Sequence, residues 1–560
     1  MNLNILNSVI GAPMDMPAPL GFDNWLTFWM VLIVSLVNAI MLSLAGYKIL
    51  QIIQLSGYKI KGFFIWLKDT KFAYIGRLVI LSFLSSAALL ITNVLLEDFF
   101  VYKIMTYLGL IFYFLFLTIF VINMYQSGAK VPLKYTHRMN RLIAITGVVI
   151  FVISFISTCI SAIYTSYFRF GALGLTPVFL PLFIIIAFYI TLPFENFNNK
   201  KYINKAKKKL ELHEDLIVIG ITGSYGKTSV KNILNTMLSA KYSVCATPYS
   251  FNTPLGLAKT VLDTLKKQDK ILIAEMGARN KGDISYLCDI VKPQIAVITG
   301  IGNQHLSTFG SLENLMLTKE ELIKALPEKG KAFINTDSNG AKLIYDRTNV
   351  EKYSINSIEN GFAVAKDIKC DSNGSKFTLE INSEKIDCET KLIGKHNISN
   401  ILLCAGVAYS MGLTLSQISV AITMLQATAH RLAIIPSSNS LVVIDDAYNG
   451  SVEGAKAAID VLALFKGKKI VITPGLVELG EEEFNSNFEF GIYMSKIADF
   501  VIIDGISAYE AISNGLAFGG FDESKIFRAS SVKQAVDLLE TIAEPNDVIL
   551  FENDLPDNYA

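Results

Sequence analysis

A glycine-rich turn begins the part of the chain whose residues are best suited to chemistry. The segment TGSYGKTS, residues 222–229, follows the apolar run LIVIGI and precedes the amphipathic stretch VKNILNTMLSAK. A strand, a glycine turn and a helix in this order form a phosphate-binding loop, because inward-facing amides and the helix N-terminus attract anions. Gly223 and Gly226 allow the backbone to turn around phosphate oxygens. We expect Lys227 to neutralise the β- and γ-phosphates of ATP and Thr228 to offer its hydroxyl to Mg²⁺.

Two further polar residues follow runs that are typical of buried strands. Glu275 ends the apolar part of ILIAEMGA, residues 271–278, and His305 comes near the end of IAVITGIGNQHL, residues 295–306. Open parallel sheets bind ligands at the carboxyl edge of their strands, so both side chains are candidate Mg²⁺ ligands. A glutamate at this edge can equally cap a helix or form an ion pair, and a single histidine is more often structural. The residues alone leave these alternatives open.

The elements around these residues alternate short β-branched runs with helical periods from residue 215 onward, which predicts a mostly parallel sheet. At 560 residues the chain is too long for one hydrophobic core. Its net charge of +1 gives no overall attraction to nucleic acid, and we expect no nucleic-acid partner. The six cysteines form no CxxC pair, which disfavours a zinc ribbon or a disulfide framework and favours a reducing cytosol.

Apolar residues make up 52% of the chain, and the excess lies almost entirely before residue 200. A helix needs roughly 20 apolar residues to cross a bilayer. Five stretches approach that length and predict five transmembrane helices: residues 26–46, 78–96, 104–124, 142–164 and 173–193. Residues 1–24 contain no Lys or Arg, so they lack the basic start of a signal peptide and the first helix is expected to be retained.

The basic residues between these stretches predict the orientation. Ten of them lie in the first and third connections: Lys48, Lys59, Lys61, Lys68, Lys71, Arg77, Lys130, Lys134, Arg138 and Arg141. Because cytoplasmic loops are enriched in Lys and Arg, we expect an external N-terminus and a cytoplasmic chain after the basic run KKYINKAKKKL, residues 200–210. The segment 58–72 interleaves aromatics with lysines, as a segment near lipid head groups does. Whether the helices only anchor the chain or also hold a lipid-linked substrate stays open.

Eight motifs in order resemble the Mur ligase family, and the match is closest to the MurF type, which adds a dipeptide to a muramyl tripeptide. The resemblance covers roughly residues 212–560, and its motifs read ITGSYGKTSVK, SFNTPLG, AEMGARNKGDI, NQHLSTFGSLENL, TKEEL, GKHNISN, AHRL and DDAYNGS. The predicted fold is multi-domain: the apolar stretches predict an N-terminal α-helical transmembrane bundle, and the resemblance implies an α/β P-loop central domain and an α/β Rossmann-like C-terminal domain. The expected boundaries are residues 1–24 for an external segment, 25–195 for the membrane domain, 196–214 for a basic linker, 215–428 for the central domain and 429–560 for the C-terminal domain.

The resemblance also implies roles for individual residues. Lys227, Lys319 and His305 are the expected catalytic residues, and Lys319 falls where the family carries a carbamylated lysine. ATP is expected to contact Gly223, Ser224, Gly226, Lys227, Thr228, Ser229, Asn397, Asn400, Arg431 and Asp446. Magnesium is expected on Thr228, Glu275, His305 and Lys319. The substrates are expected on Asn252, Thr253, Arg279, Tyr448 and Asn449.

The implied reaction transfers the γ-phosphoryl group of ATP to a substrate carboxylate, and an amine then attacks the acyl phosphate. The expected partners are membrane lipid, a carboxylate-bearing cell-envelope precursor and an amino acid or dipeptide amine donor. The C-terminal domain is expected to close over the nucleotide during the cycle.

Four features depart from the family pattern. Ile221 stands six residues before Lys227, where strict phosphate loops carry glycine. Membrane helices replace the soluble N-terminal domain that holds the UDP part of the acceptor, which motivates the hypothesis of a lipid-linked acceptor; the sequence leaves open whether the acceptor is lipid-linked or UDP-linked. The segment ITPGLVELG, residues 472–480, replaces a GDM-x-ELG run, and the acidic end FENDLPDNYA, residues 551–560, replaces a KGS-type segment. Glu552, Asp554 and Asp557 could favour an incoming amine, although a solvated terminal loop is the more ordinary interpretation.

Other functions are compatible with parts of the pattern. A polyglutamate-synthase-like ligase or a glutamate-amidating ligase of the same superfamily is the nearest alternative, but the amidating type carries a four-cysteine zinc insertion that these cysteines do not form. A non-catalytic ATP-binding module of a membrane export or sensing assembly is the alternative from another class. Lys227, Glu275, His305 and Lys319 together favour a ligase in bacterial envelope synthesis.

Overall fold

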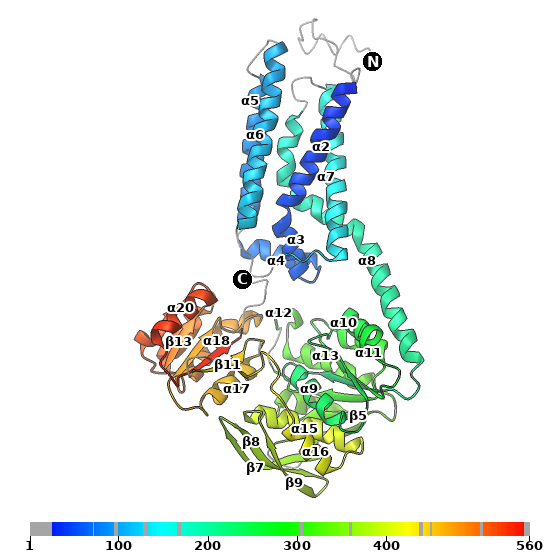
Figure 1. Cartoon of the computed structure of the whole chain (residues 1–560), viewed down its shortest axis with the longest axis vertical. Coiled ribbons are helices and arrows are strands. Elements are labelled where there is room, and N and C mark those ends of the chain that lie inside the picture. Colours follow the sequence, from blue (N-terminus) through cyan, green and yellow to red (C-terminus); the bar gives the residue numbers. More distant parts are fainter. Residues whose placement is uncertain are drawn as a thin grey trace. The chain divides into compact units, whose positions relative to one another are not determined.

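The computed structural model describes residues 25–70, 72–94, 99–126, 132–164, 170–302, 306–357, 361–435, 441–448, 451–504 and 508–553. The chain divides after residue 198 into two compact units. The first unit is helical, and the second contains two β-sheets with their covering helices. Figure 1 shows the elements of each unit.

The first unit consists of helices built from long apolar segments. They are α2 (Trp25–Ala45), α3 (Tyr47–Leu55), α4 (Ile60–Asp69), α5 (Ala73–Val94), α6 (Phe99–Gln126), α7 (His137–Tyr164), the 3₁₀ helix η2 (Gly171–Phe179) and the start of α8 (Leu180–Glu211). Helix α5 runs beside α6, and α2 packs on α7. The segment 58–72, predicted as an interfacial loop, is largely the short helix α4.

Four helical segments of the described residues are long and apolar enough to cross a membrane: Phe28–Ala45, Tyr107–Met124, His137–Ile160 and Ala172–Glu211. A fifth crossing is counted only if α4 and α5, which meet at an angle of 85°, form one bent span. The helices therefore agree with the predicted apolar stretches, and they are compatible with four or five crossings.

A buried polar network holds four elements of this unit together. The Asn38 amide on α2 donates to Ser154 Oγ on α7 at 2.9 Å and to Thr176 Oγ1 on η2 at 3.2 Å. Tyr113 on α6 donates its hydroxyl hydrogen to Asn38 Oδ1. Because the amide of Asn38 is fully bonded, this network fixes the register of the helices without an unsatisfied group at Asn38.

The second unit begins with a nine-stranded sheet in the order β2-β3-β1-β4-β5-β6-β7-β8-β9. Its strands are β1 (Ile217–Thr222), β2 (Val244–Ala246), β3 (Ile271–Glu275), β4 (Ile295–Ile298), β5 (Lys331–Asn335), β6 (Glu351–Ile355), β7 (Ala363–Asp371), β8 (Gly374–Ile381) and β9 (Glu384–Thr390). All neighbours from β2 to β7 are parallel. The chain continues from β1 to one side and later to the other, so the carboxyl end of β1 is a topological switch point.

Helices cover both faces of this sheet, because its strands are apolar on both sides. They are α9 (Lys227–Leu238), α10 (Pro254–Lys259), the π-turn η3 (Thr260–Thr264), α11 (Asp283–Val291), α12 (Leu306–Phe309), α13 (Leu312–Lys324), α14 (Asn339–Arg347), α15 (Lys395–Ser410) and α16 (Leu415–Thr423). One core cluster joins the strands to α9, α15 and α16, and another joins them to α11 and α13.

Strands β7, β8 and β9 form an antiparallel extension of this sheet that the sequence analysis did not predict. Their turns lie at Ser372–Asn373 and Asn382–Ser383, and Asn382 and Ser383 have φ of 50° and 68°. Tight hairpins favour such residues because Asn tolerates the left-handed conformation. The extension buries Phe377 and Leu379 against the core.

The C-terminal part of the second unit is a six-stranded sheet in the order β10-β11-β15-β12-β13-β14. Its strands are β10 (Ala433–Ile435), β11 (Val442–Asp446), β12 (Lys469–Thr473), β13 (Phe500–Ile503), β14 (Ile526–Arg528) and β15 (Val548–Glu552). Only the β10–β11 pair is antiparallel. The helical elements are α17 (Val452–Leu462), η4 (Gly480–Glu482), α18 (Glu483–Met494), α19 (Tyr509–Phe518), η5 (Glu523–Lys525) and α20 (Val532–Ile542).

The residues predicted as a linker, 196–214, are mostly the last turns of α8. Ile203 and Ala206 are buried in the core of the nine-stranded sheet, and Lys207 pairs with Asp289 on α11 at 2.6 Å. This end of α8 is therefore a packed element of the second unit, in addition to being basic.

Candidate nucleotide and ligase site

The glycine turn lies directly after β1, at the switch point of the sheet, as the sequence predicts. Gly226 has φ of 79° and begins α9, and a Cβ there would lie 2.9 Å from Asn400 Oδ1. A Cβ on Gly223 would lie 1.9 Å from Thr299 Oγ1, so this position accepts only glycine without a backbone shift. Ser224 donates its amide to Gly300 O and its hydroxyl hydrogen to Gly302 O. These bonds fix the turn against the segment after β4.

Lys227 extends over this turn from the first position of α9. Its Nζ donates to the carbonyls of Gly223 and Ser224, both at 2.7 Å. Burial lowers the pKa of Lys227 to about 8, the charge of Glu275 raises it and that of Arg431 lowers it. Lys227 therefore lies within electrostatic reach of the two other charged groups.

Glu275, at the end of β3, accepts hydrogen bonds from three side chains and is only 1% exposed. Thr228 Oγ1 and Lys231 Nζ each lie 3.1 Å from its Oε2. Asn252 Nδ2 lies 3.2 Å from its Oε1. The ion-pair interpretation of Glu275, which the sequence left open, is therefore correct in part: Glu275 pairs with Lys231 and also contacts the predicted magnesium ligand Thr228.

Lys231 is a site residue that the sequence analysis missed. Its side chain is 1% exposed, and its ammonium group also donates to the carbonyl of Tyr249. A signal was present, because Lys231 stands three and seven residues before Leu234 and Leu238 on the apolar stripe of α9. A charged residue on such a stripe is rarely buried without a partner.

Lys319 lies on α13 and is 3% exposed. The pKa of Lys319 is lowered to about 7 by burial and, to a smaller extent, by the charge of Lys227, while Asp283 and Glu321 act in the opposite direction. With a pKa of about 7, roughly half of the Lys319 amine is neutral at pH 7, and the neutral form is nucleophilic. Lys319 therefore lies within electrostatic reach of Lys227.

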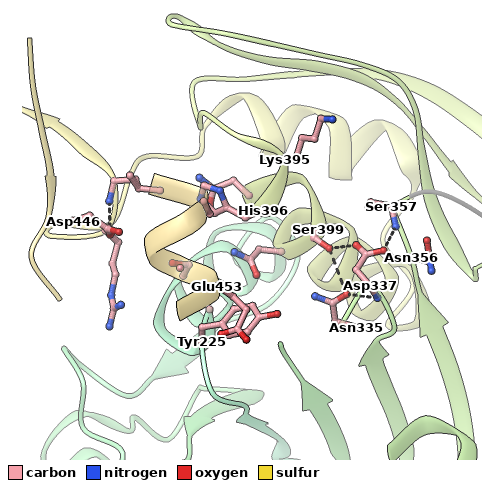
Figure 2. Close-up of a pocket in the computed structure, with 18 of the residues that line it drawn as sticks. Tyr225, Asn335, Asp337, Asn356, Ser357, Lys395, His396, Ser399, Asp446 and Glu453 are labelled. Carbon is pink, nitrogen blue, oxygen red and sulfur yellow. Dashed lines mark hydrogen bonds between the residues drawn. The ribbon is translucent and has the colours of Figure 1, made fainter. Parts of the chain in front are cut away.

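A cavity of about 490 Å³ lies between the two sheets of the second unit, beside the glycine turn. Its lining includes six of the residues expected to bind ATP: Gly226, Ser229, Asn397, Asn400, Arg431 and Asp446. Figure 2 shows Asp446 on one side of this cavity and Asn335, Asp337 and Ser399 on the other. Ser399 Oγ donates to Asp337 and lies 3.4 Å from Asn335 Oδ1, and Ser357 N donates to Asp337 Oδ1 at 2.9 Å.

The sequence analysis did not single out this polar group of Asn335, Asp337 and Ser399. Asn335 ends β5, so it follows the same rule that pointed to Glu275 at the end of β3. The carboxyl edge of a third strand therefore carries a site residue that this rule could have found.

The C-terminal sheet contributes Arg431 and Asp446 to the cavity. Asp446 Oδ1 accepts the amide of Leu432 at 3.1 Å, which ties the end of β11 to the segment that carries Arg431. His430 and Leu432 have φ of 58° and 48°, so Arg431 stands between two left-handed residues. Burial lowers the pKa of Arg431, and Asp446 and Glu275 raise it. Such strained backbone is typical of ligand-binding segments.

The expected substrate residues differ in their settings. Asn252 bonds to Glu275, and Thr253 caps α10 by accepting the amide of Gly256 at 3.3 Å. Arg279 is exposed, and its amide donates to Asp283 Oδ2 at 2.9 Å. Tyr448 is 63% exposed and packs edge-on to His430. Asn449 lies outside the described residues.

The predicted magnesium site is described only in part, because His305 lies outside the described residues. Within the described part of the chain, no group of three or more His, Cys, Asp or Glu side chains could hold a metal ion. Glu275 and Thr228 nevertheless place a carboxylate and a hydroxyl side by side, and Mg²⁺ prefers such oxygen ligands together with water and substrate phosphates. These two residues fit magnesium.

The acidic end of the chain differs from the expectation at Glu552. This residue ends β15 and is 0% exposed, so it is not part of a solvated tail. Thr473 Oγ1 donates to Glu552 Oε2 at 2.8 Å, and burial raises the pKa of Glu552 to about 8. Asp554 and Asp557 lie outside the described residues.

Two family models match the second unit. The Mur ligase middle domain matches residues 221–408, and the Mur ligase, glutamate ligase domain matches residues 430–552. Together these matches cover more than half of the chain. Residues 221–552 belong to the Mur ligase family. The two matched segments contain the nine-stranded and the six-stranded sheet, respectively, so the cavity lies between the middle and C-terminal Mur ligase domains.

Relatives of this Mur ligase region are similar over part of their length. The chain is 32% identical over 277 residues to UDP-N-acetylmuramoyl-tripeptide–D-alanyl-D-alanine ligase of Escherichia coli (strain K12), covering 49% of this chain and 61% of that protein. It is 34% identical over 250 residues to the ligase of the same name from Mycobacterium bovis, covering 44% and 49%. The chain thus spans about half to three fifths of the length of these relatives.

A solved structure has the same fold in this region. The MurF ligase of Thermotoga maritima in complex with ADP has a TM-score of 0.57 and 28% identity to this chain, covering 64% of this chain and 80% of that protein. The helical unit before residue 199 lies outside both Mur ligase matches.

Proposed function

We propose that the chain is an ATP-dependent ligase that forms an amide bond between a carboxylate-bearing cell-envelope precursor and an amine, and that its N-terminal helices anchor it in the cell membrane. The observation that carries this proposal is the contact of Thr228 with Glu275 beside Lys227 and the glycine turn, at one edge of the parallel sheet. The charge of Lys227 also acts on the buried Lys319. The adjoining cavity supplies a place for ATP, and the names of the similar ligases support a peptidoglycan-type precursor as acceptor.

In the first step, a carboxylate oxygen of the acceptor attacks the γ-phosphorus of ATP, and the bond to ADP breaks. Lys227 and the amides of the glycine turn offset the charge of the phosphoryl group during this transfer. Arg431 approaches from the C-terminal domain and adds a second cation, as its electrostatic influence on Lys227 supports. Glu275 and Thr228 are the residues that would hold Mg²⁺, which would further offset the phosphate charge.

In the second step, the amine nitrogen attacks the acyl carbon, phosphate leaves with its oxygen and the nitrogen loses a proton. An acid group that is not activated resists this attack, because a carboxylic acid and an amine only exchange a proton and form a carboxylate and an ammonium ion. Positioning both substrates in one closed site provides much of the rate. Tyr448 and Arg279 are proposed substrate contacts, since both residues are exposed.

Lys319 is proposed to act after reaction with CO₂, which the resemblance to carbamylated family members suggests. Only a neutral amine forms a carbamate, and the lowered pKa of Lys319 supports roughly equal neutral and protonated forms at pH 7. The carbamate supplies carboxylate-like oxygens suited to a hard cation.

The acceptor is proposed to be lipid-linked. The helical unit stands where the family carries its UDP-binding domain, and its apolar segments are long enough to cross a membrane. The basic end of α8 supports a cytoplasmic ligase region with an external N-terminus, because Lys-rich segments remain on the cytoplasmic side.

The experiment is an ATP-dependent coupling assay with the full chain in nanodiscs, analysed by mass spectrometry. UDP-linked and polyprenyl-linked acceptors are offered in parallel with a pool of amino acids and dipeptides. The proposal predicts an amide product with ATP, none with Lys227→Met, and a preference for the polyprenyl-linked acceptor. An ATP-dependent product with only the UDP-linked acceptor would refute the lipid-linked proposal. No amide with either acceptor would refute the ligase proposal.

A further inference from the structure

Lys231 connects the carboxylate of Glu275 to the loop of residues 248–253. One ammonium group bonds to Glu275 Oε2 at 3.1 Å and to the carbonyl of Tyr249. Asn252, three residues further along the loop, bonds to the other carboxylate oxygen of Glu275. The loop is therefore tied at two points to the residue proposed to hold magnesium, and it moves only if a buried ion pair is disturbed.

Tyr249 adopts a conformation that needs such a tie. Its φ is 49°, a left-handed value that is uncommon for an aromatic residue, and its side chain is 84% exposed. An exposed aromatic ring on a strained backbone does not stabilise the fold, and backbone strain of this kind is concentrated at ligand sites. The contact between Lys231 and the Tyr249 carbonyl stabilises the strained conformation.

The surface next to Tyr249 is aromatic and basic. The ring of Phe251 lies 6.0 Å from that of Tyr249, and Lys259 Nζ lies 5.5 Å from the Phe251 ring. The Phe251 backbone is fixed against Gly256 of α10, where a Cβ would lie 3.1 Å from Phe251 Cβ. Aromatic rings offer large rigid contact surfaces, and the lysine adds a positive charge. This surface fits an anionic molecule with a flat sugar face or peptide plane.

We propose that the Tyr249 ring contacts the acceptor, and that Lys231 is a positioning residue that holds this loop against Glu275. The inference rests on the proposed ligase function and adds two residues to it. Lys231 connects the loop of residues 248–253 to the carboxylate of Glu275 at the phosphate-binding edge. The position of the Tyr249 ring therefore depends on the position of Glu275. Asn252 strengthens the same connection from the other oxygen.

Hydrogen exchange of the full chain tests the positioning role without measuring activity. In Lys231→Met, the amides of residues 248–253 should exchange about ten- to hundredfold faster than in the wild type, because a hydrogen bond from a charged group is lost. Lys241→Met is the matched control, since Lys241 Nζ also donates to a backbone carbonyl, that of Gly412 at 2.6 Å, but is exposed. Unchanged exchange of the loop in Lys231→Met would overturn the positioning role.

A second variant covers the case in which Lys231→Met does not fold. The double variant Lys231→Met with Glu275→Met replaces a buried ion pair by two apolar side chains, which is often tolerated. It should fold and show the same faster exchange of residues 248–253. A folded double variant with wild-type exchange would equally overturn the proposal.

Steady-state kinetics test the acceptor contact. Tyr249→Gly should raise the KM for the acceptor about tenfold, with the KM for ATP within about twofold of the wild type, because glycine keeps the backbone carbonyl and loses only the ring. An unchanged acceptor KM would overturn the contact. If the wild type forms no amide at all, the ligase proposal fails, whereas the exchange experiment still decides the role of Lys231.

Discussion

Lys319 should make the ligase region less stable than an apolar residue of similar length would. Its side chain is 3% exposed, and burial lowers its pKa from 10.5 to about 7. The unfolded chain therefore binds a proton between pH 7 and 10.5 that the folded chain does not. The penalty is fully present below pH 7 and disappears as the pH rises toward 10.5.

The size of this effect follows from the same two pKa values. A difference of 3.5 between them, obtained from 10.5 and about 7, corresponds at pH 7.5 to a penalty of about 4 kcal/mol and at pH 9 to about 2 kcal/mol. Lys319→Met should therefore raise the stability of the ligase region by a few kcal/mol at pH 7.5 and by roughly half as much at pH 9. The same variant should form no amide, because it lacks the proposed carbamate. Loss of function is thus expected together with a gain in stability.

Differential scanning calorimetry of the full chain in bicarbonate-free buffer measures this difference as a shift in Tm at the two pH values. Lys324→Met is the control on the same helix, since Lys324 has 65% side-chain exposure and is expected to change stability by about 0.5 kcal/mol or less. Added bicarbonate should narrow the gap between wild type and Lys319→Met, because the proposed carbamate forms on the folded chain and stabilises it. A lower Tm in Lys319→Met, or a shift independent of pH, would refute this reasoning.

Three further predictions concern the same unit. Glu275→Gln should raise the Mg²⁺ concentration needed for half-maximal ADP formation. It should also destabilise the fold by about 3–5 kcal/mol, because Lys231 loses its buried partner. An unchanged Mg²⁺ requirement in a titration would contradict the first expectation. The kcat/KM for ATP should fall as the pH rises through about 8, where Lys227 loses its proton; a flat profile from pH 7 to 9.5 would exclude this role. The wild type should lose stability as the pH rises from 4.5 to 8, because the folded chain keeps the proton of Glu552, whose pKa is raised to about 8, while the unfolded chain releases it. Glu552→Gln should remove this loss. The same dependence of the free energy of unfolding on pH in both proteins would contradict the assignment.

The sequence predicted the parts of the site that local patterns control. The glycine turn and Glu275 follow strands, and strand order determines which carboxyl ends meet, so both could be placed before the coordinates were known. Gly226 illustrates the reason, because its left-handed φ is required by the turn itself. The apolar stretches likewise predicted the long helices of the first unit.

Long-range contacts were beyond the sequence. Burial of Lys231 and Lys319 depends on side chains that lie far along the chain, such as Glu275 for Lys231. The same holds for Glu552, whose acidic neighbours suggested a solvated tail although pairing of β15 inside the sheet buries it. The antiparallel strands β7–β9 were not predicted, because the strand–helix alternation around them does not indicate two consecutive hairpins.

The most direct test of the ligase account follows oxygen from the acceptor into phosphate. An acceptor labelled with ¹⁸O in its carboxylate is incubated with the full chain, ATP and an amine donor, and the released phosphate is analysed by mass spectrometry. An acyl phosphate requires that one labelled oxygen passes from the carboxylate to phosphate for each amide formed. We predict labelled phosphate with the wild type and none with Lys227→Met. Amide formation with unlabelled phosphate would contradict the account.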